Sequence, residues 1–113
     1  MATLDRLGET GLLTVRAERE VDELIVHAYG ELDIASAKEF EGELTRAIRS
    51  SVSGVVLDLR GVTFIDSTGL RALLAGAGLS AKIGRELRIL PGSSAVERAI
   101  ELSGLRGSLP FVE

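Results

Sequence analysis

Apolar positions along the chain follow two spacings, one typical of strands and one typical of helices. From Gly11 to Arg19 and from Glu23 to Leu32, apolar residues alternate with polar ones or β-branched residues cluster, which predicts two strands. A charged turn near residues 20–22 joins them. The second strand has apolar residues on both faces, so we expect an interior strand with covering groups on each side.

Helical spacing begins after Gly30. One stripe of apolar residues predicts an amphipathic helix, formed by Phe40, Leu44, Ala47 and Ile48. Ser36 and Glu39 have the spacing of a capping box at the start of this helix. We expect the helix to end near residues 50–53, where serines and a following glycine form a turn.

A short apolar strand, Val55 to Leu59, leads into a second helix. The apolar face of that helix consists of Leu70, Leu73, Leu74, Ala77 and Ala81, and Gly84 marks its end. Gly76 and Gly78 each lower the intrinsic stability of the helix by about 1 kcal/mol relative to alanine. Either close packing against the sheet or local looseness would account for the two glycines.

The last third of the chain contains one more strand and one more helix. Glu86 to Leu90 predicts the strand, and Ser94 with Glu97 forms a second candidate capping box before a helix that ends at Gly104. The remaining residues, 105–113, include apolar side chains that we expect to dock as a short strand or an irregular cover.

The predicted order of elements is β-β-α-β-α-β-α. This order indicates an α/β fold with a mixed sheet of four to five strands and helices packed over it. Loops that follow parallel strands gather at one edge of such a sheet. If the strands 23–32 and 55–59 run parallel, the loops that contain Asp33 and Ser67 therefore share that edge.

Composition limits the functions that this chain can have. With 113 residues, 45% of them hydrophobic, we expect a single domain over residues 1–113 with a core of about 11–105. The net charge of −4, from 13 basic and 17 acidic side chains, gives no broad positive field for nucleic acid. The absence of cysteine excludes disulfides and thiolate chemistry and fits a reducing compartment. No stretch resembles a secretory signal or a membrane span, so we expect a cytoplasmic protein without membrane insertion.

The junction between the third predicted strand and its helix carries the most specific chemistry. Residues 64–70 read Phe-Ile-Asp-Ser-Thr-Gly-Leu. A hydroxyl at Ser67 suits a phosphate switch, because helix-start amides lack partners and carry the positive end of the dipole. Capping the helix is the common role of a serine at this position and can coexist with the switch; Asp66 could be the cap instead, and Thr68 is a second, lower-ranked acceptor.

Residues 64–70 resemble the phosphorylation motif of STAS domains, the family named for sulfate transporters and anti-sigma-factor antagonists. Three further segments match that family in the expected order: Gly30-Glu31-Leu32-Asp33, the strand 55–59, and residues 96–105. The resemblance covers most of the chain, from Val21 to Leu105. It implies the STAS fold.

Within that family, the chain looks most like the single-domain anti-sigma-factor antagonists of bacteria. The resemblance implies that the chain binds an anti-sigma-factor serine kinase and thereby releases a sigma factor. It also implies that the kinase phosphorylates Ser67 with ATP and Mg²⁺, that the phosphorylated chain lets go, and that a serine phosphatase restores binding. The chain itself would be a regulator without enzymatic activity or cofactor.

We expect the partner to bind the edge formed by residues 30–36 and 63–71. The candidate contact residues are Gly30, Asp33, Asp66, Ser67, Thr68, Gly69, Leu70 and Arg71. Asp33 could orient a kinase-bound hydroxyl or metal, or could act as a turn residue. Gly69 could admit a partner's backbone, or could let the first helical turn pack closely against the sheet.

Other chemistry finds little support in the sequence. His27, the single histidine, lies in an apolar strand and is predicted to be a packed, hydrogen-bonded imidazole rather than a catalytic base or metal ligand. No recognisable general base or oxyanion site accompanies Ser67, which argues against a hydrolase. Gly76-Ala77-Gly78 falls inside a predicted helix, so it does not form a phosphate-binding loop.

Two other functions stay open. The chain could be a STAS adaptor subunit of a membrane transport complex, such as a lipid-transport ATPase, where phosphorylation is not needed. It could also be a scaffold in a large sensory assembly, although such members often carry an added sensory domain. A neighbouring kinase and sigma factor in the genome would favour the antagonist, and neighbouring transporter subunits would favour the adaptor.

Overall fold

The computed structural model describes residues 3–10, 12–50 and 53–112. Within these residues the strands are β1 (Thr3–Thr10), β2 (Leu13–Arg19), β3 (Glu23–Leu32), β4 (Gly54–Ile65) and β5 (Glu86–Leu90). The helices are α1 (Ala37–Ser50), α2 (Ser67–Ile83) and α3 (Ser94–Ser103), followed by one turn of 3-10 helix, η1 (Arg106–Ser108). The strands form one five-stranded sheet in the order β1-β2-β3-β4-β5.

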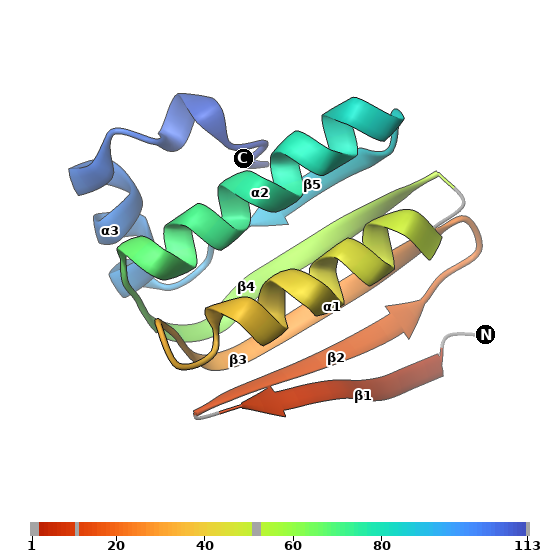
Figure 1. Cartoon of the computed structure of the whole chain (residues 1–113), viewed down its shortest axis with the longest axis horizontal. Helices are drawn as coiled ribbons and strands as arrows, with labels where there is room; N and C mark the ends of the chain where they lie inside the picture. The colour runs from red at the N-terminus through yellow and green to blue at the C-terminus, as the bar shows by residue number, and fades with distance from the viewer. Residues whose placement is uncertain (1–2, 11, 51–52, 113) are drawn as a thin grey trace.

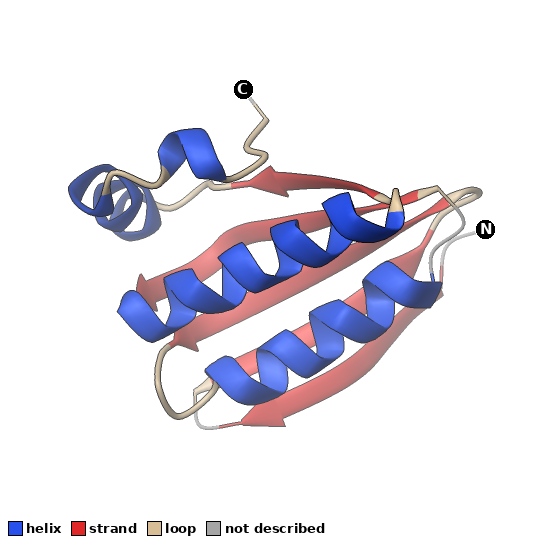
Figure 2. Ribbon diagram, turned by 45° about the horizontal axis from the view of Figure 1, so that its top comes forward, coloured by secondary structure: helices blue, strands red, loops and turns tan. Residues whose placement is uncertain are grey.

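The sheet is mixed. β1, β2 and β3 pair antiparallel, whereas β3, β4 and β5 pair parallel. Each pair of adjacent parallel strands needs a crossover connection, and α1 and α2 are these connections. Both helices lie across the same face of the sheet (Figures 1 and 2). The predicted α/β class and mixed sheet are confirmed, and from β2 onward the elements follow the predicted order.

β1 is an addition to the predicted elements. Its sequence, TLDRLGET, lacks the alternation that predicts a strand, so only its pairing with β2 reveals it. β4 is also longer than predicted and continues from Leu59 to Ile65. Arg60, Gly61 and Thr63 interrupt the apolar pattern there, and irregularities in the register with β3 absorb the interruption.

The core lies between the helices and one face of the sheet. Its buried residues include Leu24, Val26 and Ala28 of β3, Val55, Leu57 and Leu59 of β4, Phe40, Leu44 and Ile48 of α1, and Leu70 and Leu73 of α2. The intervening residues of β3 point to the other face, where His27 is half-buried and Tyr29 is exposed. The prediction of an interior strand is confirmed, since β3 lies between β2 and β4. Its second face is only partly covered, because charged side chains from the adjacent strands surround His27 and Tyr29 is left exposed.

The predicted helix caps need two corrections. The cap of α3 lies one residue earlier than expected. Ser93, and not Ser94, accepts a hydrogen bond from the backbone N–H of Val96 at 3.2 Å. Before α1, the buried hydroxyl of Ser36 donates back to the Glu31 carbonyl at the end of β3 at 2.9 Å and accepts from the N–H of Asp33 at 3.1 Å, in place of the predicted capping box. Local spacing identified both regions, but the loop geometry decides which oxygen meets which amide.

The two glycines inside α2 have different surroundings. A Cβ on Gly76 would lie 2.4 Å from Cδ2 of Leu44, so close packing explains this residue, with α1 rather than the sheet as the neighbour. A Cβ on Gly78 would meet no atom within 4 Å. Gly76 therefore sets how closely the two helices approach, and Gly78 does not.

The C-terminal tail docks beside β5, as predicted. Phe111 forms a parallel bridge with Ile89, whose N–H donates to the Pro110 carbonyl at 3.0 Å and whose carbonyl accepts from Val112 N–H at 2.9 Å.

Among the described helices, none has the length and apolar character needed to cross a bilayer.

Candidate functional site

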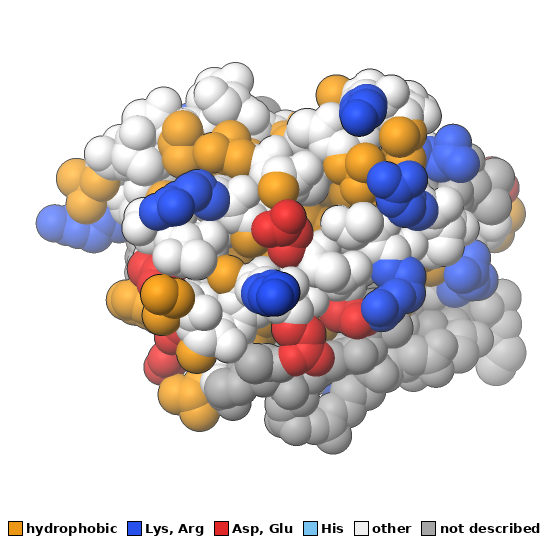
Figure 3. All heavy atoms as spheres, viewed as in Figure 1, with side chains coloured by type: hydrophobic (Ala, Val, Ile, Leu, Met, Phe, Trp, Pro, Cys, Tyr) orange, Lys and Arg blue, Asp and Glu red, His pale blue; other side chains and the backbone are white. Residues whose placement is uncertain are grey.

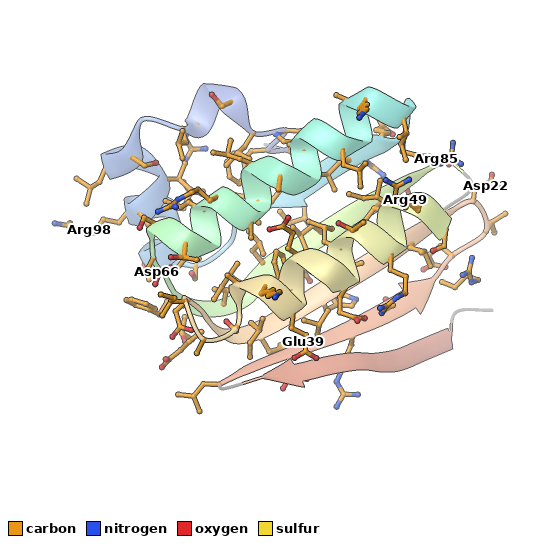
Figure 4. All side chains as sticks on the ribbon, viewed as in Figure 1. Asp22, Glu39, Arg49, Asp66, Arg85 and Arg98 are labelled. Atoms are coloured by element: carbon orange, nitrogen blue, oxygen red, sulfur yellow. The ribbon has the colours of Figure 1, made fainter. Side chains whose placement is uncertain are left out.

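The loop after β3 and the start of α2 lie together at one edge of the sheet. The two parallel strands end in register, with Leu32 opposite Ile65, and the N–H of Asp66 donates to the Leu32 carbonyl at 3.3 Å. This confirms that the segments with Asp33 and Ser67 share an edge. Figure 4 shows Asp66 at this edge, where the ribbon turns into α2.

Asp66 joins the two segments through its side chain. Its Oδ1 accepts a hydrogen bond from the N–H of Gly69 at 2.9 Å, which makes it the N-cap of α2. Its Oδ2 accepts from the N–H of Ile34 at 3.2 Å. Of the two candidate caps, the structure thus assigns Asp66, and it adds a link to the β3–α1 loop that the local sequence does not indicate.

Asp33 organises the loop on the other side. Its Oδ1 accepts from the N–H of Ala35 at 3.0 Å, and its carbonyl accepts from the N–H groups of Ser36 and Ala37 at 3.0 and 2.8 Å. These bonds are those of an Asx turn leading into α1. The interpretation of Asp33 as a turn residue is therefore confirmed, and its half-buried side chain is hydrogen-bonded within its own loop.

Ser67 is the first residue of α2 and is exposed. Because Asp66 makes the capping bond, the Ser67 hydroxyl has no capping role, and within the described residues it has no hydrogen-bond partner. Thr68 is half-buried beside it. Of the two candidate acceptors, Ser67 is thus the more accessible.

Gly69 and Leu70 support the site from below. A Cβ on Gly69 would lie 2.5 Å from the Leu32 carbonyl oxygen and 2.8 Å from Ile65 Cγ1, so this glycine lets the first turn of α2 pack against the strand ends. Leu70 is only 6% exposed and lies in the core. These two expected contact residues therefore position the surface and contribute little of it.

Gly30 has a structural role of its own. Its φ is +106°, and a Cβ there would lie 1.9 Å from the carbonyl oxygen of Leu12. That oxygen accepts the N–H of Glu31 at 3.0 Å, which ties the start of β2 to the end of β3. Only glycine fits this backbone and this close approach.

Exposed apolar side chains surround the site and were not among the predicted contact residues. Ile34 is 79% exposed, Leu12 70% and Phe64 47%. Phe64 lies opposite Glu31 in the register, and Leu12 bonds to Glu31. Figure 3 shows apolar and acidic side chains next to each other along the edge where α1 and α2 begin. The period-two alternation of β4 could have indicated that Phe64 points outward, since Ile65 points inward.

A charged cluster lies on the face of the sheet that does not face α1 and α2. His27 Nδ1 lies 2.9 Å from Asp58 Oδ2, and His27 Nε2 lies 3.1 Å from Glu18 Oε1. The guanidinium Nε of Arg60 donates to Asp58 Oδ1 at 2.9 Å. The cluster crosslinks β2, β3 and β4, and it confirms the predicted packed, hydrogen-bonded imidazole.

This cluster alters the ionisation of Asp58. Burial would raise the pKa of its carboxyl group, but hydrogen bonds from the Arg60 side chain, the Arg60 backbone and His27 outweigh burial and lower the pKa from 3.8 to about 2. The same contact with Asp58 raises the pKa of Arg60. Neither this cluster nor any other group of three or more His, Asp or Glu side chains among the described residues is placed to hold a metal ion.

Comparison with known proteins gives a consistent family. The STAS domain family model matches residues 14–113. An anti-sigma F factor antagonist of Paenibacillus polymyxa is 29% identical over 102 residues, covering 89% of this chain and 87% of that protein. The crystal structure of an anti-sigma factor antagonist from Mycobacterium paratuberculosis has a TM-score of 0.73 and 25% identity, covering 88% of this chain and 84% of that one.

Two further solved structures share the fold, and one further sequence match is partial. The Bacillus cell fate determinant SpoIIAA in its phosphorylated form has a TM-score of 0.64 at 19% identity, covering 88% of this chain and 91% of that one. The murine anion transporter Slc26a9 has a TM-score of 0.70 at 22% identity, but this chain covers only 16% of it. The ribosomal protein uL10 of Staphylococcus aureus is 32% identical over 79 residues, and the match spans 43% of its length.

Proposed function

The chain belongs to the STAS domain family, and we propose that it acts as an anti-sigma-factor antagonist controlled by phosphorylation of Ser67. One observation carries this proposal: Asp66 caps α2, which leaves the exposed hydroxyl of Ser67 at the sheet edge available for modification. The anti-sigma F factor antagonist that matches most of the chain supports the same function.

The proposed partner is a kinase-type anti-sigma factor, bound at the edge formed by residues 30–36 and 63–71. The exposed side chains of Ile34 and Phe64 give this edge apolar contact area around Ser67. Binding to the kinase would free the sigma factor that it holds. The antagonist would have no enzymatic activity of its own and would act in the cytoplasm.

Phosphorylation is the proposed off switch. The kinase transfers the γ-phosphoryl group of ATP to Ser67 Oγ, ADP leaves, and the hydroxyl proton passes to a base on the kinase. The phosphate adds nearly two negative charges and three oxygens to the centre of the contact surface, which opposes binding through desolvation and repulsion. A phosphatase reverses the change by hydrolysis to serine and inorganic phosphate.

The fold should tolerate this modification. Ser67 is exposed and forms no capping bond, so a phosphate breaks no contact between the elements. The N–H groups of the first helical turn also favour a negative charge nearby. Phosphorylation would therefore change the surface and not the architecture.

Binding to the cognate kinase tests the proposal. Wild-type protein and Ser67→Ala should capture one small ATP-binding kinase from a lysate of the source organism, and Ser67→Glu should lose it. Ser94→Glu is a matched control, because Ser94 is also the exposed first residue of a helix whose cap is the preceding residue. Equal capture of the kinase by Ser67→Ala and Ser67→Glu would overturn the switch.

A STAS adaptor in a membrane transport complex is the second candidate function. It is favoured by the fold that the chain shares with part of the anion transporter Slc26a9. The same capture experiment separates the two functions, since an adaptor would retain transport subunits equally with Ser67→Ala and Ser67→Glu. The partial match to uL10 carries no proposal, because a net charge of −4 offers little attraction for nucleic acid.

A further inference from the structure

Arg71 lies one helical turn after Ser67 on the exposed side of α2. Both residues are exposed, and Ser67 is the first residue of the helix. Residues four apart on an α-helix are surface neighbours, with Cβ atoms about 5–6 Å apart. A phosphate on Ser67 would therefore lie within reach of the Arg71 guanidinium group.

Arg71 has no competing anion nearby on its helix. From Ser67 to Ile83, α2 contains no aspartate or glutamate. The carboxylate of Asp66 is already engaged, since its two oxygens accept the backbone N–H groups of Gly69 and Ile34 at 2.9 and 3.2 Å. Across the residues that the structure describes, Arg71 forms no ion pair with a carboxylate.

The fold itself gives no reason for this arginine. A cation in the last turn of a helix is stabilised by the helix dipole, as Lys82 is in α2. Arg71 is the fifth residue of the helix and gains no such stabilisation. An exposed charged residue without a structural gain is a candidate for function.

We propose that Arg71 binds the phosphate of phosphorylated Ser67 within the same chain. This inference rests on the proposed phosphorylation of Ser67. A guanidinium group can donate two parallel hydrogen bonds to phosphate oxygens, and an anion four residues before a cation is the favourable orientation on a helix. Arg71 would thus hold the phosphate against α2 and stabilise its dianionic form.

Titration of the phosphate tests this pair directly. Phosphoserine is placed at position 67 by genetic code expansion, and the second pKa of the phosphate is measured by ³¹P NMR. Arg71→Gln should raise that pKa by about 0.15 to 0.4, the shift that corresponds to the 0.2–0.5 kcal/mol typical of an i,i+4 ion pair. Arg71→Lys should give a smaller rise, because it keeps the charge and loses the paired donors.

Arg49→Gln is the control with the same change in net charge. Arg49 is exposed in the last turn of α1, at the opposite end of the molecule from Asp66 (Figure 4). It should leave the phosphate pKa within about 0.1 of the wild-type value, since its charge is screened over that distance. Equal phosphate pKa values in Arg71→Gln and Arg49→Gln would overturn the proposed pair.

The result is independent of the kinase, because the phosphate is installed during translation. If Ser67→Glu loses the kinase while the phosphate titrates identically in Arg71→Gln and Arg49→Gln, the pair fails and the proposed function stands. If Arg71→Gln raises the pKa while no kinase binds the unmodified protein, the pair stands and the proposed function fails. Circular dichroism of each variant would confirm that the exposed substitution leaves the fold intact.

Discussion

The carboxylate of Asp66 accepts a hydrogen bond from the backbone N–H of Ile34, which lies 32 residues earlier in the chain. The same carboxylate caps α2 through Gly69. One side chain thus fixes both the start of a helix and the loop beside it, so the two halves of the candidate partner surface hold a set position relative to one another.

Replacement of Asp66 should affect both stability and binding. Asp66→Ala removes the cap and the loop bond, and we expect the free energy of unfolding to fall by about 1–2 kcal/mol, measured by urea denaturation. Ser93→Ala, which removes only the cap of α3, should cost about 1 kcal/mol and leave kinase binding unchanged. Equal losses of kinase affinity in the two variants would contradict the linking role of Asp66.

Stability should depend on pH through Asp58. The pKa of the Asp58 carboxyl group is about 2 in the folded chain, whereas the ordinary value of 3.8 applies to the unfolded chain. On acidification the unfolded chain therefore takes up the proton first. The contribution of Asp58 is therefore present above about pH 4 and is lost as the pH falls toward 2, with a total of at most about 2.5 kcal/mol. Urea denaturation between pH 6 and pH 2 should show a shallower loss of stability in Asp58→Asn than in the wild type. Parallel pH profiles would exclude this role for Asp58.

Removal of the imidazole at the centre of the charged cluster should destabilise the sheet. His27→Ala would leave the carboxylates of Glu18 and Asp58 without the ring nitrogens that they contact at 3.1 and 2.9 Å. We expect a loss of about 1–3 kcal/mol in the free energy of unfolding. Lys38→Ala, at an exposed position of α1, should change it by less than about 0.5 kcal/mol. A loss in His27→Ala no larger than in Lys38→Ala would mean that the cluster adds nothing to stability.

The two glycines of α2 should respond oppositely to alanine. Gly78→Ala adds a methyl group in open space and should stabilise the protein by about 0.5–1 kcal/mol through helix propensity. Gly76→Ala places its methyl group against the buried side chain of Leu44 and should destabilise by about 1–3 kcal/mol. Thermal unfolding of the pair provides the comparison, and a stabilising Gly76→Ala would show that α1 moves away without cost.

The exposed apolar residues at the sheet edge should contribute to kinase affinity. Ile34→Ser removes apolar contact area next to Ser67, and we expect binding to weaken by about tenfold or more, measured by calorimetry. Val21→Ser is the control, since Val21 is 92% exposed before the opposite end of β3. If both variants bind the kinase as tightly as the wild type, the partner contacts another surface.

The sequence alone predicted the parts of this structure that depend on local spacing. β3 and β5 begin and end at the predicted residues, since alternation and flanking turns define them. β1 was not predicted, because its strand state depends on pairing with β2 and not on its own pattern. The extension of β4 was missed for the same reason, as its last residues are held by contacts with the end of β3.

At the candidate site, too, local features could be predicted from the sequence and contacts between distant segments could not. The residue types at 66–69 indicated a helix start with an exposed hydroxyl, and the structure has that arrangement. Local spacing could not predict the hydrogen bond from Ile34 to Asp66 or the exposure of Leu12, because both depend on segments that are distant in the sequence. Buried Leu70 was grouped with the surface because neighbouring positions of a helix point in different directions.

The division of the edge between two chain segments determines what a modifying enzyme can recognise. A peptide of residues 60–75 would present Ser67 but would lack Ile34, the turn around Asp33 and the bond that holds them beside the helix. A kinase that recognises this edge would accept the folded domain as substrate and ignore the linear motif. Each newly made chain would then become subject to control only after its sheet has closed.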